Sequence, residues 1–486
     1  MKSTRIFLPV GLLTSAALIF TGCSATDPSE GISKVNADIA QRAGVAGDRP
    51  APDADRKKND AVVSELLSGG LTVDSATRVA LINNRAIRAT FEEIGVSQAE
   101  LDQAGRLPNP TLTASTRWPN ERPRGPNVEF GLAFDMLDAV LIPLRKRIAE
   151  EQFTRAQRRV GHEVLGVIAE VKSATYDHLA SRELRDRLAT IASVNDAAAE
   201  LAKRQYDAGN INRLEFEQFT ATAAQSKLDV MRAEAEVLTS REKINRLLGL
   251  SGVLTEWKVS AGLPALPENE PEPDALEEMA VQRRLDLAAA RIDIALAQKA
   301  LDLKEGTRWF PAGVNVGVDT ERDTDGMRVT GPSLSLGLPI FDQGQAEVAR
   351  LEAIVRQAQS RVEALESDIR ADVRTALARL HVAQATADLY RKTLLPQRKR
   401  IVRETLLQYN AMQKSPYELL AAKERQQAAE KESVETLKDY WLARVELDRT
   451  LGGVRSVPGE IAAPASPGKP ANEPDEAASA PTHHAH

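Results

Sequence analysis

The chain has 486 residues, a formal net charge of -6 at pH 7, 27% charged residues and only 4% aromatic residues. Positive and negative side chains are interspersed, which argues against a nucleic-acid-binding surface. No bilayer-spanning apolar run follows the N-terminal segment, which excludes a membrane protein built of helices. Few aromatic residues and many Ala, Glu, Arg, Leu and Gln residues favour long helices over a compact mixed core.

The N-terminal residues have the pattern of a secretory signal. Lys2 and Arg5 precede an apolar run at 6–20, and Thr21 and Gly22 lead to Cys23, the single cysteine of the chain. A basic start, an apolar core and small residues are typical of a signal peptide, and a cysteine at this place resembles a bacterial lipobox. We predict a lipoprotein signal peptide at 1–22 and lipid attachment at Cys23. An ordinary signal peptide that happens to contain a cysteine is the alternative.

The next segment shows no regular pattern before the first long helix. Residues 23–70 are rich in Asp, Ala, Pro and Gly, which predicts a flexible linker from the lipid to the folded body. From Leu71 to about Arg106 the apolar residues recur at helical spacing, and the Pro-Asn-Pro sequence at 108–110 ends that helix.

Two stretches of alternating residues follow and predict a β-hairpin. Residues 111–118 and 128–135 each place apolar side chains on one face and polar ones on the other, and 119–127 is a polar turn. A membrane barrel has this alternation with its apolar face outward. A soluble sandwich has it with the apolar face inward, so the hairpin alone leaves both architectures open.

A helical hairpin of unusual length comes next. Helical periodicity runs from Arg145 to about Tyr206, which at about 1.5 Å per residue is on the order of 90 Å. The sequence at 208–210 breaks it, and a second helix is predicted from Leu214 to Leu248. Two such antiparallel helices form a coiled-coil hairpin. Residues 263–273 are a Pro-rich connector.

The same order of elements then recurs. Residues 275–304 are helical, 314–319 and 333–338 alternate, and two more long helices run to Gln408, with a bend at Pro396, and from Tyr417 to Leu451. Glu215 and Gly249 recur 203 positions later, as Glu418 and Gly452. This constant spacing predicts two copies of one unit, at 71–262 and 274–452, followed by a disordered tail at 453–486.

These features together resemble the TolC family of outer-membrane efflux proteins. The resemblance spans Leu71 to Gly452 and is carried by the duplicated plan, by Leu-Pro-Asn-Pro at 107–110 and by the Leu-Pro-Ile-Phe-Asp-x-Gly sequence at 338–344. With Cys23 the chain is similar to the lipoprotein branch, the outer-membrane factor of a tripartite RND-type efflux system. The resemblance implies an α+β membrane protein: a homotrimer whose four strands per protomer close a 12-stranded β-barrel, continued by a long α-helical coiled-coil barrel.

The resemblance also implies a function. The chain is expected to be a passive channel in the bacterial outer membrane, lipid-anchored, with its helical part in the periplasm. It would contact outer-membrane lipid, a periplasmic adaptor (membrane fusion protein) and an inner-membrane RND-type pump, and conduct drugs or heavy-metal cations. No catalytic or cofactor-binding pattern occurs in the body of the chain, so no enzyme activity is predicted. The alternative is a periplasmic coiled-coil scaffold or adaptor lipoprotein without a pore, which would need neither a second copy nor a second hairpin.

Apart from Cys23, the candidate site residues fall into five groups. The predicted barrel-to-tunnel corner consists of Leu338, Pro339, Ile340, Phe341, Asp342 and Gly344. The pore-lining candidates share the polar face of the predicted strands: Thr113, Ser115, Glu129, Asp135, Asn315, Asp319, Ser333 and Ser335. Trp118, Trp309 and Phe310 are candidate anchors at the membrane interface. The alternative for the polar face is simple solvation of one side of a soluble sheet.

The remaining candidates lie at the helical turns and in the tail. The periplasmic tip and gate candidates are Arg204, Asp207, Gly209, Arg213, Arg403, Glu404, Glu418 and Lys423. A charged residue on a coiled coil is often only a solvated flank, so each has that alternative. His483, His484 and His486 are weak candidates for metal ligands, against the alternative of a flexible tail with incidental histidines.

Overall fold

The computed structural model describes residues 27–44, 56–120, 125–260, 262–267, 275–309 and 312–453. Cys23, Phe310 and the three tail histidines lie outside these residues. Lipid attachment, the signal peptide, the aromatic anchor at 310 and metal binding by the tail therefore stay predictions.

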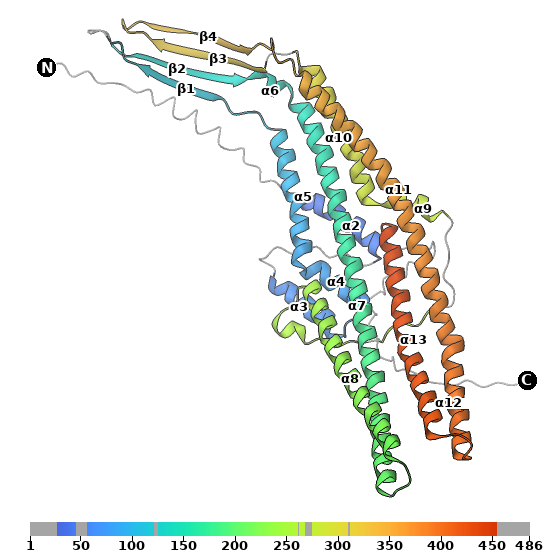
Figure 1. Ribbon diagram of the computed structural model, residues 1–486. Coiled ribbons are helices and arrows are strands. Elements are labelled where there is room, and N and C mark those ends of the chain that lie inside the picture. The colour runs from blue at the N-terminus through green and yellow to red at the C-terminus, as the bar shows by residue number, and fades with distance from the viewer. Residues whose placement is uncertain are drawn as a thin grey trace, which may run out of the picture. The chain divides into compact units, whose positions relative to one another are not determined.

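The elements follow one another in two similar series (Figure 1). The first series is α2 Ser29–Ala43, α3 Arg56–Ser68, α4 Val73–Asn83, α5 Arg85–Ala104, β1 Thr111–Arg117, β2 Asn127–Asp135, α6 Met136–Val140, α7 Ile142–Asp207, α8 Arg213–Leu248 and the 3-10 turn η3 Gly252–Thr255. The second series is α9 Leu276–Arg283, α10 Leu285–Thr307, β3 Ala312–Arg322, β4 Arg328–Gly337, α11 Gln345–Leu389, the π-helical turn η4 Tyr390–Leu394, α12 Leu395–Asn410 and α13 Pro416–Thr450.

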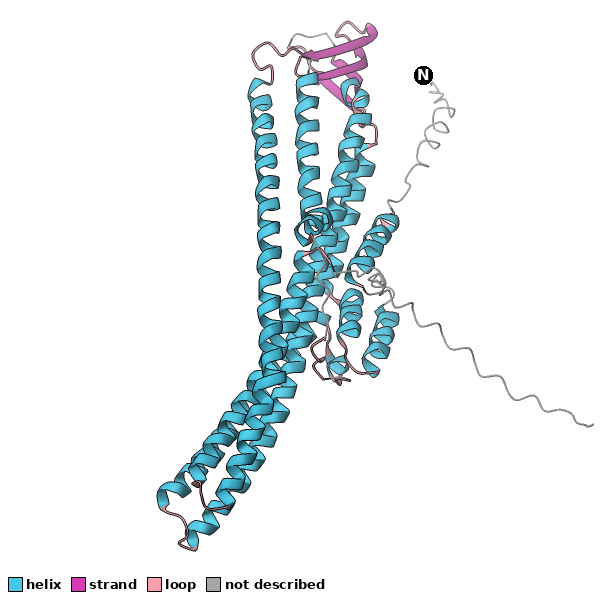
Figure 2. Ribbon diagram, turned by 90° about the vertical axis from the view of Figure 1, so that its right-hand side faces the viewer, coloured by secondary structure: helices cyan, strands magenta, loops and turns pink. Residues whose placement is uncertain are grey.

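The four strands form one antiparallel sheet in the order β1-β2-β3-β4. Each series supplies one hairpin, and pairing of β2 with β3 joins the two hairpins into a sheet. The sheet lies at one end of the long helices (Figure 2). Among the described residues, no cluster of buried apolar side chains includes a strand residue. The sheet therefore has no hydrophobic core of its own.

The long helices pack as a layer. Next to the sheet, α5 packs on α7, α7 on α10, and α10 on α11; farther away, α8 packs on α7, α7 on α13, and α13 on α11 and α12. At their far ends the helices turn back as two hairpins, α7–α8 and α12–α13 (Figure 1). The two turns are capped alike: Asn212 and Glu215 form a capping box at the start of α8, and Ser415 and Glu418 form one at the start of α13.

The segment expected to be a flexible linker contains two helices, so that expectation is wrong for the described part. Ile32, Val35 and Ile39 follow one face of α2 and are buried against α5 and α7. Val63 and Leu67 of α3 are buried beside α4. The apolar stripes of α2 and α3 are short and are separated by Asp, Ala and Gly residues. The composition of the segment therefore did not indicate the two helices. Burial of these few side chains favours the folded helices over a solvated chain.

The two helices predicted before the hairpins are each broken once. Asn84 separates α4 from α5: its side-chain oxygen accepts hydrogen bonds from the backbone of Ala86 and Ile87, which caps α5. Its amide nitrogen also donates to Leu247 O at 2.6 Å. Arg284 stands at the equivalent break between α9 and α10, where its guanidinium is within 2.6 Å of Asp286 and 3.3 Å of Asp372. Apolar periodicity continues across both breaks, so it did not reveal them.

The predicted bend at Pro396 takes the form of a π-helical turn. Residues 390–394 widen the helix immediately before α12, and Pro396 occupies its first turn. Proline has no backbone N–H and its ring crowds the preceding turn, so a wider turn there is a local solution to that conflict.

Candidate functional site

The register of the sheet places all eight pore-lining candidates on one face. Thr113 pairs with Gly131 and Gly131 with Asp319; Ser115 pairs with Glu129; Asp135 pairs with Asn315 and Asn315 with Ser335. Ser333 pairs with Gly317, on the same face. Their role as a pore wall stays a prediction, but the common face that it requires is present.

This polar face is acidic and is tied by side-chain contacts. Ser115 donates to Glu129 at 3.1 Å, and the Arg117 guanidinium lies 3.5 Å from the same carboxylate. Asn127 donates to Glu321 at 2.5 Å. Glu129 and Glu321 are direct cross-strand partners, an unfavourable juxtaposition of like charges that these donors moderate. The carboxylates of this face attract cations and repel anions.

Glu321 was missed by the sequence reasoning. The strands β3 and β4 extend to Arg322 and Arg328, beyond the alternating stretches 314–319 and 333–338 that the sequence predicted. Asp323 and Gly326 close that turn through backbone hydrogen bonds. Asp319 and Glu321 continue the alternation of the strand, and this pattern could have indicated the longer strands. The many charged residues in this stretch obscured the pattern.

The opposite face of the sheet is apolar and uncovered in the described chain. Leu112 of β1 is 72% exposed and Leu334 of β4 is 64% exposed, although both are large apolar residues. The other members of the face are Phe130, Leu132, Val316, Val318 and Leu336. A contiguous exposed apolar surface marks contact with another apolar medium, such as lipid or a partner protein.

The corner after β4 is built around Gly344. Asp342 accepts a hydrogen bond from the Gly344 backbone at 2.8 Å, and Gly344 begins α11 with a φ of 73°. Phe341 is 94% exposed, and Leu338 and Ile340 are also exposed. The corner therefore combines a left-handed glycine with three apolar side chains that point away from the protein, next to the apolar face of the sheet.

The corresponding corner of the first copy has a different construction. Asp135 accepts a hydrogen bond from Asp138 N at 3.0 Å and so caps the short helix α6, which leads through Leu141 into α7. Asp135 thus has a local capping role in addition to its place on the polar face. This corner has no counterpart of Gly344, so the two copies differ here.

The structure does not bring the tip and gate candidates together as one cluster. Arg204 pairs with Glu200 at 3.4 Å, Arg213 with Glu217 at 3.6 Å, and Arg403 with its neighbour Glu404 at 3.6 Å. These are local contacts of exposed side chains, which contribute little to stability. Glu418 caps α13 and is 2.5 Å from Lys414, and Asp207 ends α7. Their roles in a gate stay predictions.

The sequence did not indicate a contact between the two helical hairpins. Tyr417 at the start of α13 lies beside the side chains of Glu215 and Asn212 at the start of α8, so the starts of the two helices are neighbours. Partial removal from water and the Glu215 carboxylate raise the pKa of Tyr417. Tyr417 is the residue after Pro416 in an ordinary capped helix start, so the sequence carried no signal for this role.

An apolar cavity lies beside that contact. It has a volume of about 320 Å³, is partly open to solvent and is lined by residues of α7, α8, α12 and α13. Leu201, Phe219, Leu406 and Leu420 are among its apolar walls, and Lys423, a gate candidate, lines it. The two hairpins are therefore loosely packed against each other near their turns, which permits relative movement there.

The two hairpin turns carry different residues at the position with left-handed backbone. Gly209 adopts a φ of 75° in the first turn, and Met412 adopts a φ of 59° at the equivalent position of the second while 95% exposed. A left-handed conformation costs a residue with a side chain about 1–2 kcal/mol.

We expect Met412→Gly to slow hydrogen exchange of the amides beside this turn, whereas Met412→Ala leaves exchange unchanged. Faster hydrogen exchange in Met412→Gly would contradict the inference that the positive φ of Met412 strains this turn.

The body of the described chain shows no metal site. Among the described residues, no group of three or more His, Cys, Asp and Glu side chains is placed to hold a metal ion. His178 is buried and hydrogen-bonded to Ser240 at 2.9 Å; burial first, then Arg182 and Arg241, lowers its pKa to about 4. Because protonation is penalised in the folded state, this histidine reduces stability as pH falls below about 6.5.

The described helices were compared with the requirements for a helix that crosses a membrane. None of them combines the length and the apolar composition that a bilayer-spanning helix requires.

Comparison with known proteins gives three findings. The sequence profile described as "outer membrane efflux protein" matches residues 77–250 and 276–453, one segment in each series of elements. The chain is 23% identical over 389 residues to the cobalt-zinc-cadmium resistance protein CzcC of Cupriavidus metallidurans, covering 79% of this chain and 91% of that protein. The solved structure of CusC is similar in fold, with a TM-score of 0.67 and 16% sequence identity, and the match covers 79% of this chain and 92% of CusC. The Campylobacter jejuni CmeC outer membrane channel is also similar, with a TM-score of 0.69 and 15% sequence identity, and the match covers 84% of this chain and 89% of CmeC.

Proposed function

The chain belongs to the outer membrane efflux protein family, and on that premise we propose that it is the exit channel for divalent metal cations in a tripartite efflux system. As a family member it is an outer-membrane channel of an efflux pump, with its helical part in the periplasm.

The open sheet supports assembly of three copies. One chain supplies four strands with unpaired edges at β1 and β4 and an uncovered apolar face. In a lipid environment every unpaired backbone group costs several kcal/mol, so the edges must pair. Pairing β1 of one copy with β4 of the next in a ring of three gives a closed barrel of twelve strands. Its polar, acidic face then lines the pore and its apolar face meets lipid.

Two observations support metal cations as the substrate. The relative CzcC is named for resistance to cobalt, zinc and cadmium. The proposed pore wall carries Glu129, Asp135, Asp319 and Glu321 against a single basic residue of the same face, Arg117, among the described strands. A negative wall concentrates cations without a dedicated binding site. The channel would be passive and the pump would select the substrate.

Deletion of the chain from its bacterium tests this substrate class. We expect greater sensitivity to Co²⁺, Zn²⁺ and Cd²⁺, restored by the wild-type chain, and unchanged sensitivity to organic antibiotics. Sensitivity to antibiotics alone would contradict the metal substrate and favour drugs, while leaving the channel itself in place.

A periplasmic adaptor and an inner-membrane pump complete the proposed system, with the two helical turns as the adaptor contact. The closed state is held in part by the Tyr417 contact to Glu215, because opening requires the hairpins to move apart. The adaptor-like alternative, a coiled-coil lipoprotein without a pore, accounts for the helices but leaves the sheet and its exposed apolar face without a role.

Removal of that contact is expected to open the channel more often. We predict a few-fold higher open probability in planar bilayers for Tyr417→Phe, which loses only the hydroxyl. Tyr206→Phe is the matched control, because Tyr206 stacks on Phe216 within its own hairpin at a ring distance of 5.1 Å and Phe keeps that stack. Equal open probability in the two variants would remove Tyr417 from the gate.

A further inference from the structure

The cavity between the two helical hairpins is lined by two polar side chains without a partner in the described chain. They are Asn195 of α7 and Lys423 of α13. Asn195 is only 8% exposed, and among the described residues its amide forms no hydrogen bond. Lys423 is half-buried, and no described carboxylate lies within ion-pair distance of its ammonium group. Because a buried amide is nearly always hydrogen-bonded, to protein, water or ligand, the cavity has room for a further polar group here.

The antiparallel course of α7 and α13 brings Asn195 and Lys423 to the same level. Tyr176 of α7 stacks on Trp441 of α13 with a ring distance of 5.1 Å, which fixes the register of the two helices. Asn195 lies 19 residues after Tyr176, and Lys423 lies 18 residues before Trp441. The two stretches of helix therefore have nearly the same length, and one head group can reach both side chains.

The two ends of the cavity differ in charge. Along α13 its wall runs from Pro416, at the helical turn, to Lys423, which lies about 10 Å farther along the helix. Glu215 lines the end at the turn, where its carboxylate accepts a hydrogen bond from Asn212 N at 3.2 Å and lies beside Tyr417. One end is thus negative and already hydrogen-bonded, whereas the other end is positive and without a partner.

Between these ends the walls of the cavity are apolar. They come from all four helices of the two hairpins and include Ala198, Leu201, Phe219, Leu406 and Leu420. Apolar walls with a few polar groups are typical of pockets for small molecules. The volume of about 320 Å³ is at the lower end of the range of such pockets, roughly 300–1,000 Å³, so it suits one apolar chain and not the two chains of a phospholipid.

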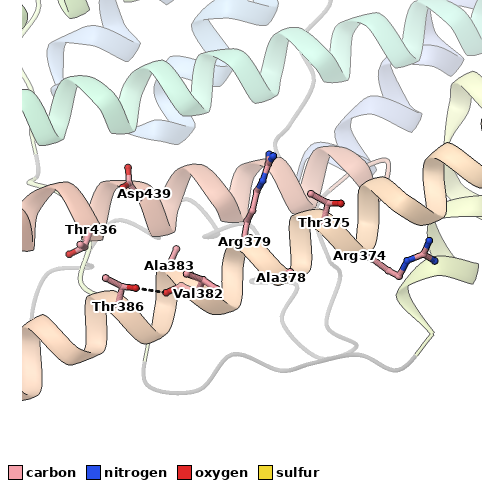
Figure 3. A pocket seen from close by; sticks show the side chains of 9 residues that line it. All are labelled: Arg374, Thr375, Ala378, Arg379, Val382, Ala383, Thr386, Thr436 and Asp439. Atoms are coloured by element: carbon pink, nitrogen blue, oxygen red, sulfur yellow. Dashed lines mark hydrogen bonds between the residues drawn. The ribbon is translucent and has the colours of Figure 1, made fainter.

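The larger hollow of the described chain lacks this combination. It has a volume of about 630 Å³ and follows α11 beside α13 (Figure 3). Arg374 and Val382 of its wall are exposed, and the Thr386 hydroxyl donates to Val382 O at 2.7 Å. Thr436, a buried polar side chain of the same wall, donates to Ser433 O at 3.2 Å. These hydroxyls are satisfied within the chain, so they leave no buried donor for a ligand.

We propose that the cavity between the hairpins binds an anionic amphiphile with a single apolar chain, such as a medium-chain fatty acid. Its carboxylate accepts hydrogen bonds from the Lys423 ammonium and the Asn195 amide, and its chain extends along the apolar walls toward the helical turns. The Glu215 carboxylate repels a negative head group from the other end, which sets the orientation. Because the head group contacts both α7 and α13, the bound molecule links the two hairpins. A single chain forms the whole site, so the proposal depends neither on the pore nor on its substrate.

Photolabelling of the full-length protein in lipid nanodiscs tests the site. The probe is decanoate with a diazirine group near the end of its chain, and labelled peptides are located by mass spectrometry. We expect saturable labelling of the peptides that contain Leu201 and Leu420. Excess decanoate is expected to displace the probe, whereas decyltrimethylammonium, which has the same chain and a positive head group, does not. Labelling confined to strand peptides, or equal displacement by both compounds, would overturn the proposal.

Two variants and a matched control test the head group and the cavity separately. Lys423→Met removes the charge and is expected to raise the probe concentration for half-maximal labelling about ten-fold. Lys431→Met is the control, because Lys431 lies on the same helix outside the cavity, 4.0 Å from Glu435, and is expected to change nothing. Ala198→Phe fills the cavity and is expected to abolish labelling without lowering the thermal midpoint of unfolding. Labelling of Lys423→Met at the wild-type concentration would overturn the proposal. Normal labelling of a protein that does not conduct would remove the channel and leave this site in place.

Discussion

Leu334→Arg is expected to abolish assembly in the outer membrane and metal resistance. Leu334 lies on the apolar face of β4 and is 64% exposed in the single chain. An arginine on the lipid face of a barrel costs about 2–4 kcal/mol near the middle of the bilayer. Three copies carry the change, so the cost is incurred three times. The measurement is the amount of heat-resistant trimer in outer-membrane fractions, together with the tolerated concentration of Zn²⁺.

The neighbouring Ser335→Arg is the matched control for this effect. Ser335 precedes Leu336 in the same strand but belongs to the polar face, where it pairs with Asn315. The arginine there is expected to leave the trimer intact and to reduce cation conductance, because it adds positive charge to the acidic wall. Equal loss of trimer in both variants would contradict the assignment of the two faces.

Gly249→Ala is expected to lower the stability of the helical body by about 3 kcal/mol, from the left-handed conformation and from overpacking. Gly249 ends α8 with a φ of 67°, and an added Cβ would lie 2.7 Å from the Asn83 carbonyl oxygen. Asn83 in turn donates to Leu248 O and Gly249 O, each at 2.9 Å. The close approach of this helix end to the break between α4 and α5 leaves no room for a side chain.

Gly209→Ala separates the two contributions. Gly209 also has a positive φ, of 75°, but no heavy atom lies within 4 Å of the position of its Cβ. We expect a cost of about 1 kcal/mol there, from backbone conformation alone. The comparison is made by thermal unfolding of the purified protein in detergent, followed by helical circular dichroism. An equal loss of stability in both variants would show that the contact with Asn83 does not matter.

The repeat was the most informative feature of the sequence. The recurrence of Glu215 as Glu418 and of Gly249 as Gly452 predicted two equivalent units, and the structure gives physical reasons for those residues. Glu215 and Glu418 cap equivalent helices, and Gly452, like Gly249, packs against the backbone of a helix break, here at Arg283. These constraints are local and repeated, so they left a pattern that counting could find.

Long-range contacts left no such pattern. Tyr417 lies beside Glu215 of the other hairpin, and Arg42 of α2 donates to Arg283 O at 2.7 Å, 241 residues farther along the chain. Neither contact affects periodicity or spacing. The predicted faces of the strands came from alternation alone, and that is enough to assign a face but not to locate Glu321 opposite Glu129. The candidates at the tips were selected by charge, and the structure gives several of them local partners instead.

The central claim is that this chain forms a water-filled channel through the outer membrane. The most direct test is electrical recording from planar bilayers after addition of the purified full-length protein. We predict discrete conductance steps that are selective for cations, produced by a trimer and reduced in Ser335→Arg. A protein that remains monomeric and leaves the bilayer non-conducting would contradict the channel and favour a coiled-coil scaffold of the periplasm.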